Sequence, residues 1–210
     1  MPHHNTEGGT DMPPIPDCLS MVTSADSVRG PGQGHWTYKD YAALPDDGRR
    51  YEVVEGTLFM APSPSRWHQE TVGELFAYLR DYIKMHELGR VYMAPFDVEL
   101  ANNIVVQPDV MVILNANREK VVENRVVGAP DLVVEVASPG TAGYDRREKQ
   151  NIYAHSSVTE YWIADPSART VEVLLLEFGE YRPLGVFHGK ATLPSKVVAG
   201  FPTQVEQFFA

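Results

Sequence analysis

Two acidic residues, each at one end of a short apolar run, are the groups in this chain best suited to do chemistry. Asp109 follows a Gln-Pro pair and opens the run 110–114, and Glu135 interrupts the run 132–136 before a Ser-Pro pair. Short β-branched runs bounded by proline predict strands buried on both faces, where an ionised carboxylate is costly unless it is compensated. A divalent metal between the two carboxylates, with Lys149 close by, would compensate them and would suit phosphodiester hydrolysis.

A helix is expected from Asp145 to His155, after the strand that carries Glu135. Asp145, Lys149 and Tyr153 are spaced by four residues, so they share one helix face, which can look back at the end of that strand. The other interpretation of the same spacing is a solvated Asp145–Lys149 ion pair, which is commonplace on helix surfaces.

The remaining pattern predicts a mixed α/β sheet. We expect a short helix at 38–44, capped by Thr37, and a long amphipathic helix from 65 to about 87. Residues 115–127 are expected to form a loop with a helical turn, and the apolar tail 193–210 is expected to dock on the domain. Further strands are expected at 51–54, 57–61, 91–100, 104–106, 160–164 and 170–177, the first two joined by a Glu55-Gly56 turn.

Composition sets the domain organisation and the expected location. Residues 1–34 are rich in Gly and Pro and lack apolar periodicity, so they predict a disordered leader before a single domain at 35–210. The single cysteine, Cys18, lies in that leader, which excludes a disulfide framework and favours a cytoplasmic setting. No apolar stretch approaches the roughly 20 residues of a membrane-spanning helix, so no membrane association is expected.

The charge balance bears on possible partners. The net charge is -10, from 28 acidic and 18 basic residues among 210. This balance argues against a broad basic surface for nucleic acid. The local basic clusters are the pairs Arg49-Arg50 and Arg146-Arg147, which are either solvated charge or contacts for phosphates.

Several further residues admit both a functional and a structural interpretation. Glu52 is either a solvent-facing residue of a hairpin strand or a third acid near the metal. His68, in the first turns of the long helix, is either a hydrogen-bonded surface or core histidine or a supporting residue of the site. Tyr153 and Trp162 are expected in the core, and Glu55 is expected to be only a turn residue.

An ordered series of motifs carries a family resemblance. The series is Tyr51-Glu52-Val53-Val54-Glu55-Gly56, His68, Gln107-Pro108-Asp109, the segment 130–136, Ser138-Pro139, Asp145, Lys149 and Glu160-Tyr161-Trp162. In this series, from about Thr37 to Phe187, the chain resembles the Uma-two family of restriction endonucleases. The resemblance implies a restriction-endonuclease-like fold of the Pro-Asp, Asp/Glu-x-Lys nuclease superfamily, in which a central mixed β-sheet is flanked by helices and carries the acids on two adjacent strands.

The chain departs from the superfamily signature at one position. The strand motif should end in lysine, but here it is Glu135-Val136-Ala137. The resemblance suggests that the lysine has moved to the following helix, where Lys149 is the substitute. A family can also keep its carboxylates without cutting anything, because fold does not imply activity.

The function expected from these residues is metal-dependent hydrolysis of phosphodiester bonds in nucleic acid, with DNA as the expected substrate. Asp109, Glu135 and the carbonyl of Val136 would hold Mg²⁺, for which Mn²⁺ could substitute. Lys149 would orient or help deprotonate the attacking water and counter the charge on phosphorus, and Glu52 would assist. His68, Asp145 and Tyr153 are expected to support the site.

Two other functions stay open. The first is a catalytically silent nuclease fold that serves as a binding or assembly module, which the acidic net charge favours. The second is a two-carboxylate glycoside hydrolase, which gives Lys149 no role and usually needs aromatic sugar platforms near the acids. A homodimer is expected for a duplex-cutting enzyme, since two-fold dimers are the commonest assemblies.

Overall fold

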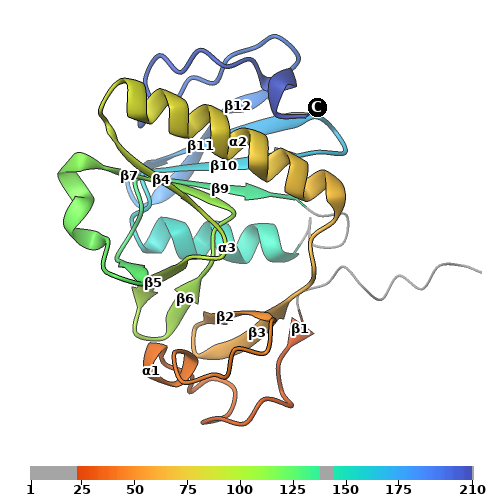
Figure 1. Cartoon of the computed structure of the whole chain (residues 1–210), viewed down its shortest axis with the longest axis vertical. Helices are drawn as coiled ribbons and strands as arrows, with labels where there is room; N and C mark the ends of the chain where they lie inside the picture. The colour runs from red at the N-terminus through yellow and green to blue at the C-terminus, as the bar shows by residue number, and fades with distance from the viewer. Residues whose placement is uncertain (1–22, 138–143, 210) are drawn as a thin grey trace, which may run out of the picture.

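The computed structural model describes residues 23–137 and 144–209, and their strands form two six-stranded sheets (Figure 1). The N-terminal sheet has the strand order β1 (Thr23–Ser24), β3 (Thr57–Ala61), β2 (Arg50–Val54), β6 (Ile104–Val106), β5 (Asp97–Ala101) and β8 (Arg125–Val127). The central sheet has the order β12 (Glu180–His188), β11 (Thr170–Glu177), β10 (Glu160–Asp165), β9 (Leu132–Val136), β7 (Val110–Leu114) and β4 (Gly89–Met93). The central sheet is mixed, because β9 and β10 are parallel and its other pairs are antiparallel.

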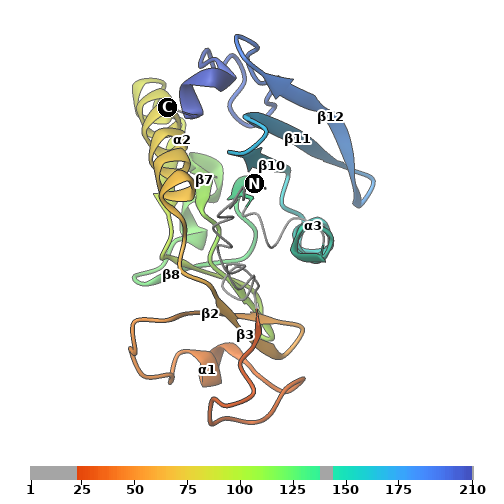
Figure 2. The same ribbon diagram turned by 90° about the vertical axis from the view of Figure 1, so that its right-hand side faces the viewer.

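Helices cover both faces of the central sheet, as the side view in Figure 2 shows. The long helix α2 (Arg66–Met85) lies on one face, and α3 (Tyr144–His155) lies on the opposite face. Shorter helices complete the chain: α1 (Tyr38–Tyr41), η1 (Asn115–Lys120) and η2 (Val205–Phe208). This arrangement, a mixed sheet flanked by helices, is the restriction-endonuclease-like architecture that the family resemblance implies.

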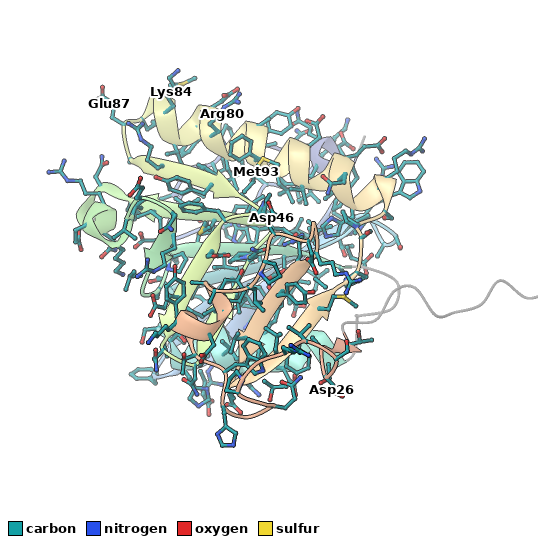
Figure 3. The ribbon with its side chains drawn as sticks, turned by 60° about the horizontal axis from the view of Figure 1, so that its bottom comes forward. Asp26, Asp46, Arg80, Lys84, Glu87 and Met93 are labelled. Carbon is teal, nitrogen blue, oxygen red and sulfur yellow. The ribbon has the colours of Figure 1, made fainter. Side chains whose placement is uncertain are left out.

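The long helix forms where its sequence pattern places it. Its N-cap is Ser65, whose hydroxyl accepts a hydrogen bond from the backbone N–H of His68 at 3.2 Å. Apolar residues at three- and four-residue spacing bury one face, namely Val72, Leu75, Leu79 and Ile83. Arg80 and Lys84 lie on the outer side of the helix (Figure 3). The predicted amphipathic helix is therefore confirmed.

The central strands are buried on both faces, and alternate residues serve two different clusters. In β7, Val110 and Val112 pack with α2 and the docked C-terminal tail, whereas Met111 and Ile113 face the cluster that includes Tyr153 of α3. The tail contributes large side chains to the first cluster, among them Phe201, Phe208 and Phe209. This packing explains why runs as apolar as 110–114 lack the alternation of a half-exposed strand.

The Gln107-Pro108-Asp109 segment connects the two sheets. It follows β6 of the N-terminal sheet and leads directly into β7 of the central sheet. Strands β7 and β9 are antiparallel neighbours, with Val110 opposite Val134. Asp109 therefore comes directly before one of two neighbouring strands, and Glu135 lies in the other.

Three segments differ from the predicted elements. The strand expected at 91–100 is two strands in different sheets, β4 and β5, because Pro95 lies between them and cannot donate a ladder hydrogen bond. The loop expected at 115–127 contains η1 and the edge strand β8. Strand β12 was not expected, since Pro183 and Gly185 interrupt its pattern, and it pairs with β11 at the edge of the central sheet.

The leader predicted to be disordered is packed over its last part. Strand β1 pairs with β3, and Ala25 belongs to the same buried cluster as Trp36. The side chain of Gln33 holds this segment by bonding both the N–H and the carbonyl of Leu58. Residues 1–22, with Cys18, lie outside the described residues. No helix in the described part of the chain is long and apolar enough to span a bilayer.

Candidate active site

Two predicted acids, Glu52 and Glu135, contact the ammonium group of a third predicted site residue, Lys149. The Nζ atom of Lys149, on α3, lies 3.3 Å from Oε1 of Glu52 and 3.2 Å from Oε1 of Glu135. Glu52 belongs to β2 of the N-terminal sheet, and Glu135 belongs to β9 of the central sheet. The three side chains are only 7 % to 14 % exposed. Lys149 therefore links the two sheets through a largely desolvated pair of carboxylates.

Asp109 stands beside this group and is held through one of its oxygens. Its Oδ2 accepts a hydrogen bond from the backbone N–H of Val136 at 2.9 Å and lies 3.1 Å from Nε2 of His68. Burial raises the pKa of Asp109, but the hydrogen bond and charge of His68, the Val136 N–H and the charge of Lys149 outweigh it. The pKa of Asp109 is therefore lowered, and this carboxyl stays ionised.

Glu135 titrates in the opposite direction. Burial raises its pKa most; Lys149 lowers it, while the charges of Asp109 and Glu52 raise it further, and the hydrogen bond from Tyr153 lowers it. The net result is a pKa of about 7. The Tyr153 hydroxyl donates to Oε1 of Glu135 at 2.6 Å, and burial together with the two glutamates raises the pKa of Tyr153. Two adjacent acids with opposite shifts are typical of functional sites.

A polar network behind Glu52 was missed in the sequence, although its central residue belongs to a quoted motif. The backbone N–H of Gln107 donates to Oε1 of Glu52 at 2.9 Å. The Gln107 side chain donates to the Tyr41 hydroxyl and to Asp97, and its Oε1 accepts from Arg50 at 3.1 Å. Gln107 therefore fixes Glu52 from behind, and the glutamine in the Gln-Pro-Asp motif was the available signal.

The remaining candidates have simpler surroundings. The guanidinium of Arg50 bonds both the side chain and the carbonyl of Gln107, whereas Arg49 is exposed beside Asp47. Glu55 occupies the turn between β2 and β3 with a positive φ of 48°. Trp162 is buried, as expected. The side chains of Asp145, Arg146 and Arg147 lie outside the described residues.

The donor set fits a hard divalent cation held by few protein ligands. The contacts of Asp109 converge on Oδ2 and those of Glu135 converge on Oε1, so within the described part of the chain the second oxygen of each carboxylate has no protein partner. Within residues 23–137 and 144–209, no group of three His, Cys, Asp or Glu side chains is placed to hold a metal. Mg²⁺ usually binds through one or two carboxylates and keeps several waters, so two acids suffice.

His68 carries a further sign of functional placement. Its Nε2 faces Asp109, and its Nδ1 is a buried nitrogen that has no hydrogen-bond partner among the described residues. Native proteins rarely leave a buried polar atom unsatisfied, so this nitrogen requires a partner that the described residues do not supply.

The comparisons with known proteins identify a family and a fold. A family model described as "Uma2: Putative restriction endonuclease" matches residues 38–206. Five chains of solved structures match, among them a crystal structure described as a putative nuclease belonging to DUF820 from Anabaena variabilis. That structure has a TM-score of 0.68 and 19% identity, and the match covers 82% of this chain and 97% of the other. No curated protein matches.

The two similarities carry different information. At 19% identity, the solved structure establishes the shared fold. The family model spans most of the chain, including every residue of the candidate site. The homodimer and the cytoplasmic location expected from the sequence stay predictions. The chain belongs to the Uma2 family, described as putative restriction endonucleases.

Proposed function

We propose that this protein is a Mg²⁺-dependent endonuclease that hydrolyses phosphodiester bonds in nucleic acid, with DNA as the expected substrate. The observation that carries the proposal is the position of the Lys149 ammonium, which lies 3.2 Å from Glu135 and 3.3 Å from Glu52. Asp109 directly precedes the strand that neighbours the strand of Glu135. A cation set among buried acids is the arrangement that the nuclease signature requires, and here the helix supplies the lysine that the strand lacks.

Asp109 and Glu135 would hold the metal, with the carbonyl of Val136 as a predicted further ligand. When bound, Mg²⁺ would act as a Lewis acid and would lower the pKa of an attacking water. The low pKa of Asp109 keeps one carboxylate ready to bind, because that carboxyl is ionised throughout the neutral range. The pKa of about 7 for Glu135 makes the second carboxylate the one that responds to pH.

The other residues act on orientation and charge. Lys149 would orient the attacking water and counter the negative charge that develops on phosphorus, which is the role of a preorganised cation in a dry site. Glu52 holds the ammonium in place and is itself held by the N–H of Gln107. His68 and Tyr153 each fix one carboxylate oxygen, His68 on Asp109 and Tyr153 on Glu135.

A nuclease fold that binds without cutting is the second candidate function. The net charge of -10 favours it, because affinity for polyanions ordinarily comes from basic surface. This function would keep metal binding at Asp109 and Glu135 but would show no cleavage.

The test compares the unmutated protein with Asp109→Asn on plasmid, single-stranded DNA and RNA at low salt, with Mg²⁺, Mn²⁺ or EDTA. We expect metal-dependent cleavage that Asp109→Asn reduces by more than about 10², since it loses a metal ligand. Asp81→Asn is the matched control, because Asp81 is exposed and pairs with Arg80. Cleavage that persists in Asp109→Asn, or no cleavage by any variant, would overturn the enzyme and leave the binding module.

A further inference from the structure

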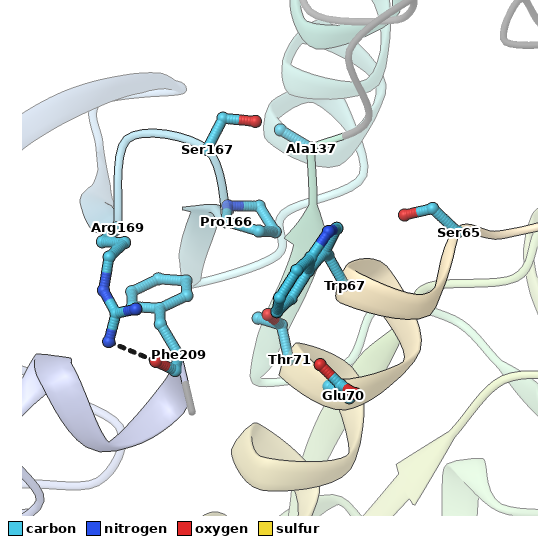
Figure 4. Close-up of a pocket in the computed structure, with 9 residues that line it drawn as sticks. All are labelled: Ser65, Trp67, Glu70, Thr71, Ala137, Pro166, Ser167, Arg169 and Phe209. Carbon is cyan, nitrogen blue, oxygen red and sulfur yellow. Dashed lines mark hydrogen bonds between the residues drawn. The ribbon is translucent and has the colours of Figure 1, made fainter.

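A cavity adjoins the candidate site at the start of α2. Its volume is about 300 Å³, and it lies between the first turns of α2, the end of β9 and the turn between β10 and β11 (Figure 4). The residues that line it include Trp67, Glu70, Thr71, Ala137, Pro166, Arg169 and Phe209. A cavity at the lower end of the ~300–1,000 Å³ range of ligand pockets suits one flat ring system better than a large ligand.

The cavity shares its walls with the catalytic elements. Ala137 follows Val136, whose N–H donates to Asp109, and comes two residues after Glu135. Thr71 comes about one helical turn after His68, which contacts the same Asp109 oxygen. A group that fills the cavity would therefore be bound next to the phosphodiester bond to be cut.

Trp67 gives the cavity its chemical character. It is 55% exposed, whereas Trp36 and Trp162, the other two tryptophans, are 2% and 0% exposed. Its indole projects toward Pro166 and Ala137, in the middle of the lining residues (Figure 4). An exposed indole beside an apolar recess is the usual platform for a stacked base.

We propose that this cavity binds an unpaired base of a single-stranded nucleic acid, stacked on Trp67, next to the bond to be cut. The inference rests on the proposed function and specifies its substrate as single-stranded. Because the net charge is -10, affinity has to come from something other than a broad basic surface, and stacking is largely independent of net charge.

Two guanidinium groups supply local charge for the phosphates of such a strand. The guanidinium of Arg66 lies 4.1 Å from the centre of the Trp67 ring and pairs with Glu70 at 3.5 Å, and Arg66 and Glu70 are both exposed enough to rearrange around a strand. Arg169 lines the cavity and donates to the carbonyl of Phe209. A phosphate on either side of the stacked base would find one cation nearby.

Tryptophan fluorescence tests the inference without cleavage. Trp36 and Trp162 are buried, so quenching by a bound base reports on Trp67. We expect a short oligodeoxythymidylate, added in EDTA at low salt, to quench the emission saturably. An abasic oligomer of the same length and the matching duplex should quench much less. No quenching, or equal quenching by the abasic oligomer, would overturn the inference.

Variants separate stacking from general affinity. Trp67→Ala should weaken binding of the oligomer by about 10-fold or more, and Trp67→Phe should keep most of it, since a phenyl ring can still stack on the base. Binding of the variants is measured by anisotropy of a labelled oligomer. Phe178→Ala is the matched control, because Phe178 is a fully exposed aromatic in the β11–β12 turn. Equal binding by Trp67→Ala and the unmutated protein would overturn the inference.

The experiments distinguish failure of the base site from failure of the proposed endonuclease function. Quenching that depends on the base, with no cleavage by the unmutated protein, supports the base site and rejects the endonuclease. Cleavage that Trp67→Ala leaves unchanged on single strands supports the endonuclease and rejects the base site.

Discussion

Glu160 and Glu135, two buried glutamates on neighbouring parallel strands, differ in the groups that contact their carboxylates. Glu160, at the start of β10, has no exposed surface, and its carboxylate accepts hydrogen bonds from the Trp162 indole at 2.6 Å and from the backbone N–H groups of Lys196 and Val197 at 2.7 and 3.1 Å. Glu135, near the end of β9, faces other acids and is met by the ammonium of the long Lys149 side chain and by one hydroxyl.

This contrast separates a structural carboxylate from a functional one. Donors fixed to the fold, such as the backbone of 196–197, satisfy Glu160 and attach the C-terminal tail to the sheet. Glu135 instead has a pKa raised to about 7, so the fold does not compensate its charge fully. A bound ligand can supply the compensation that the fold leaves out, and acids of this kind therefore mark candidate sites.

Removing the structural acid should have the largest effect on stability. Glu160→Ala leaves one buried indole N–H and two partly buried backbone N–H groups without an acceptor, so we expect the free energy of unfolding to fall by on the order of 3 kcal/mol. In a domain of this size, Tm should fall by roughly 6 °C or more in calorimetry. Glu177→Ala, at an exposed position of β11, is the control. A Tm within about 2 °C of the unmutated protein would show that the tail is held by other contacts.

Removing the positive charge of Lys149 should affect turnover rather than folding. Lys149→Met keeps the length of the side chain and loses its charge, so we expect cleavage to fall by about 10² while Mg²⁺ binding is largely retained. Single-turnover kinetics and titration calorimetry with Mg²⁺ measure the two effects. Lys84→Met is the control, since Lys84 is exposed on α2. Unchanged turnover in Lys149→Met would contradict the assignment of the displaced lysine.

The raised pKa of Glu135 predicts a specific pH dependence of stability. Because the folded protein binds this proton more tightly than the unfolded chain, its contribution is full below pH 4.5 and is lost as pH rises toward about 7. Glu135→Gln should therefore remove that loss. Calorimetry of the metal-free protein over this pH range and just above it checks the prediction. Parallel curves for Glu135→Gln and the unmutated protein would mean that Glu135 titrates normally.

Removing the Tyr153 hydroxyl, which donates a hydrogen bond to Glu135, should have the smallest effect. Its hydrogen bond lowers the pKa of Glu135, so Tyr153→Phe should raise that pKa further and move the acidic limb of the cleavage profile to higher pH. We expect turnover at the optimum to change by less than about 10-fold, because the hydroxyl orients an oxygen and is not placed as a proton donor to substrate. A shift toward lower pH would contradict the sign derived from the hydrogen bond.

The sequence predicted the strands and helices whose patterns are local. The hairpin around Glu55-Gly56 follows from turn chemistry, the helix after Thr37 follows from its N-cap, and the long helix and the strands beside Asp109 and Glu135 follow from apolar spacing and apolar runs. These signals reside within a few residues of each element. They suffice to predict the apolar runs beside which the acids lie, whereas the adjacency of the two strands was implied by the family resemblance.

The missed features depend on contacts between distant segments. Segment 23–34 packs through Ala25 and Gln33, which are too few to create a periodic pattern. Strand β12 contains Pro183 and Gly185, and an edge position tolerates both because one side of the strand needs no ladder partner. The role of Gln107 is invisible for the same reason, since the partner of its N–H lies 55 residues earlier.

The distance along the chain between Lys149 and Glu52 has a consequence for biosynthesis. The two residues are 97 positions apart, and they meet only when α3 has docked between the two sheets. A chain that leaves the ribosome before α3 is made contains Glu52 and Asp109 but lacks the lysine that completes the group. Under the proposed function, interrupted copies are therefore inactive, and the hazard that a nuclease poses to its own cell is confined to finished molecules.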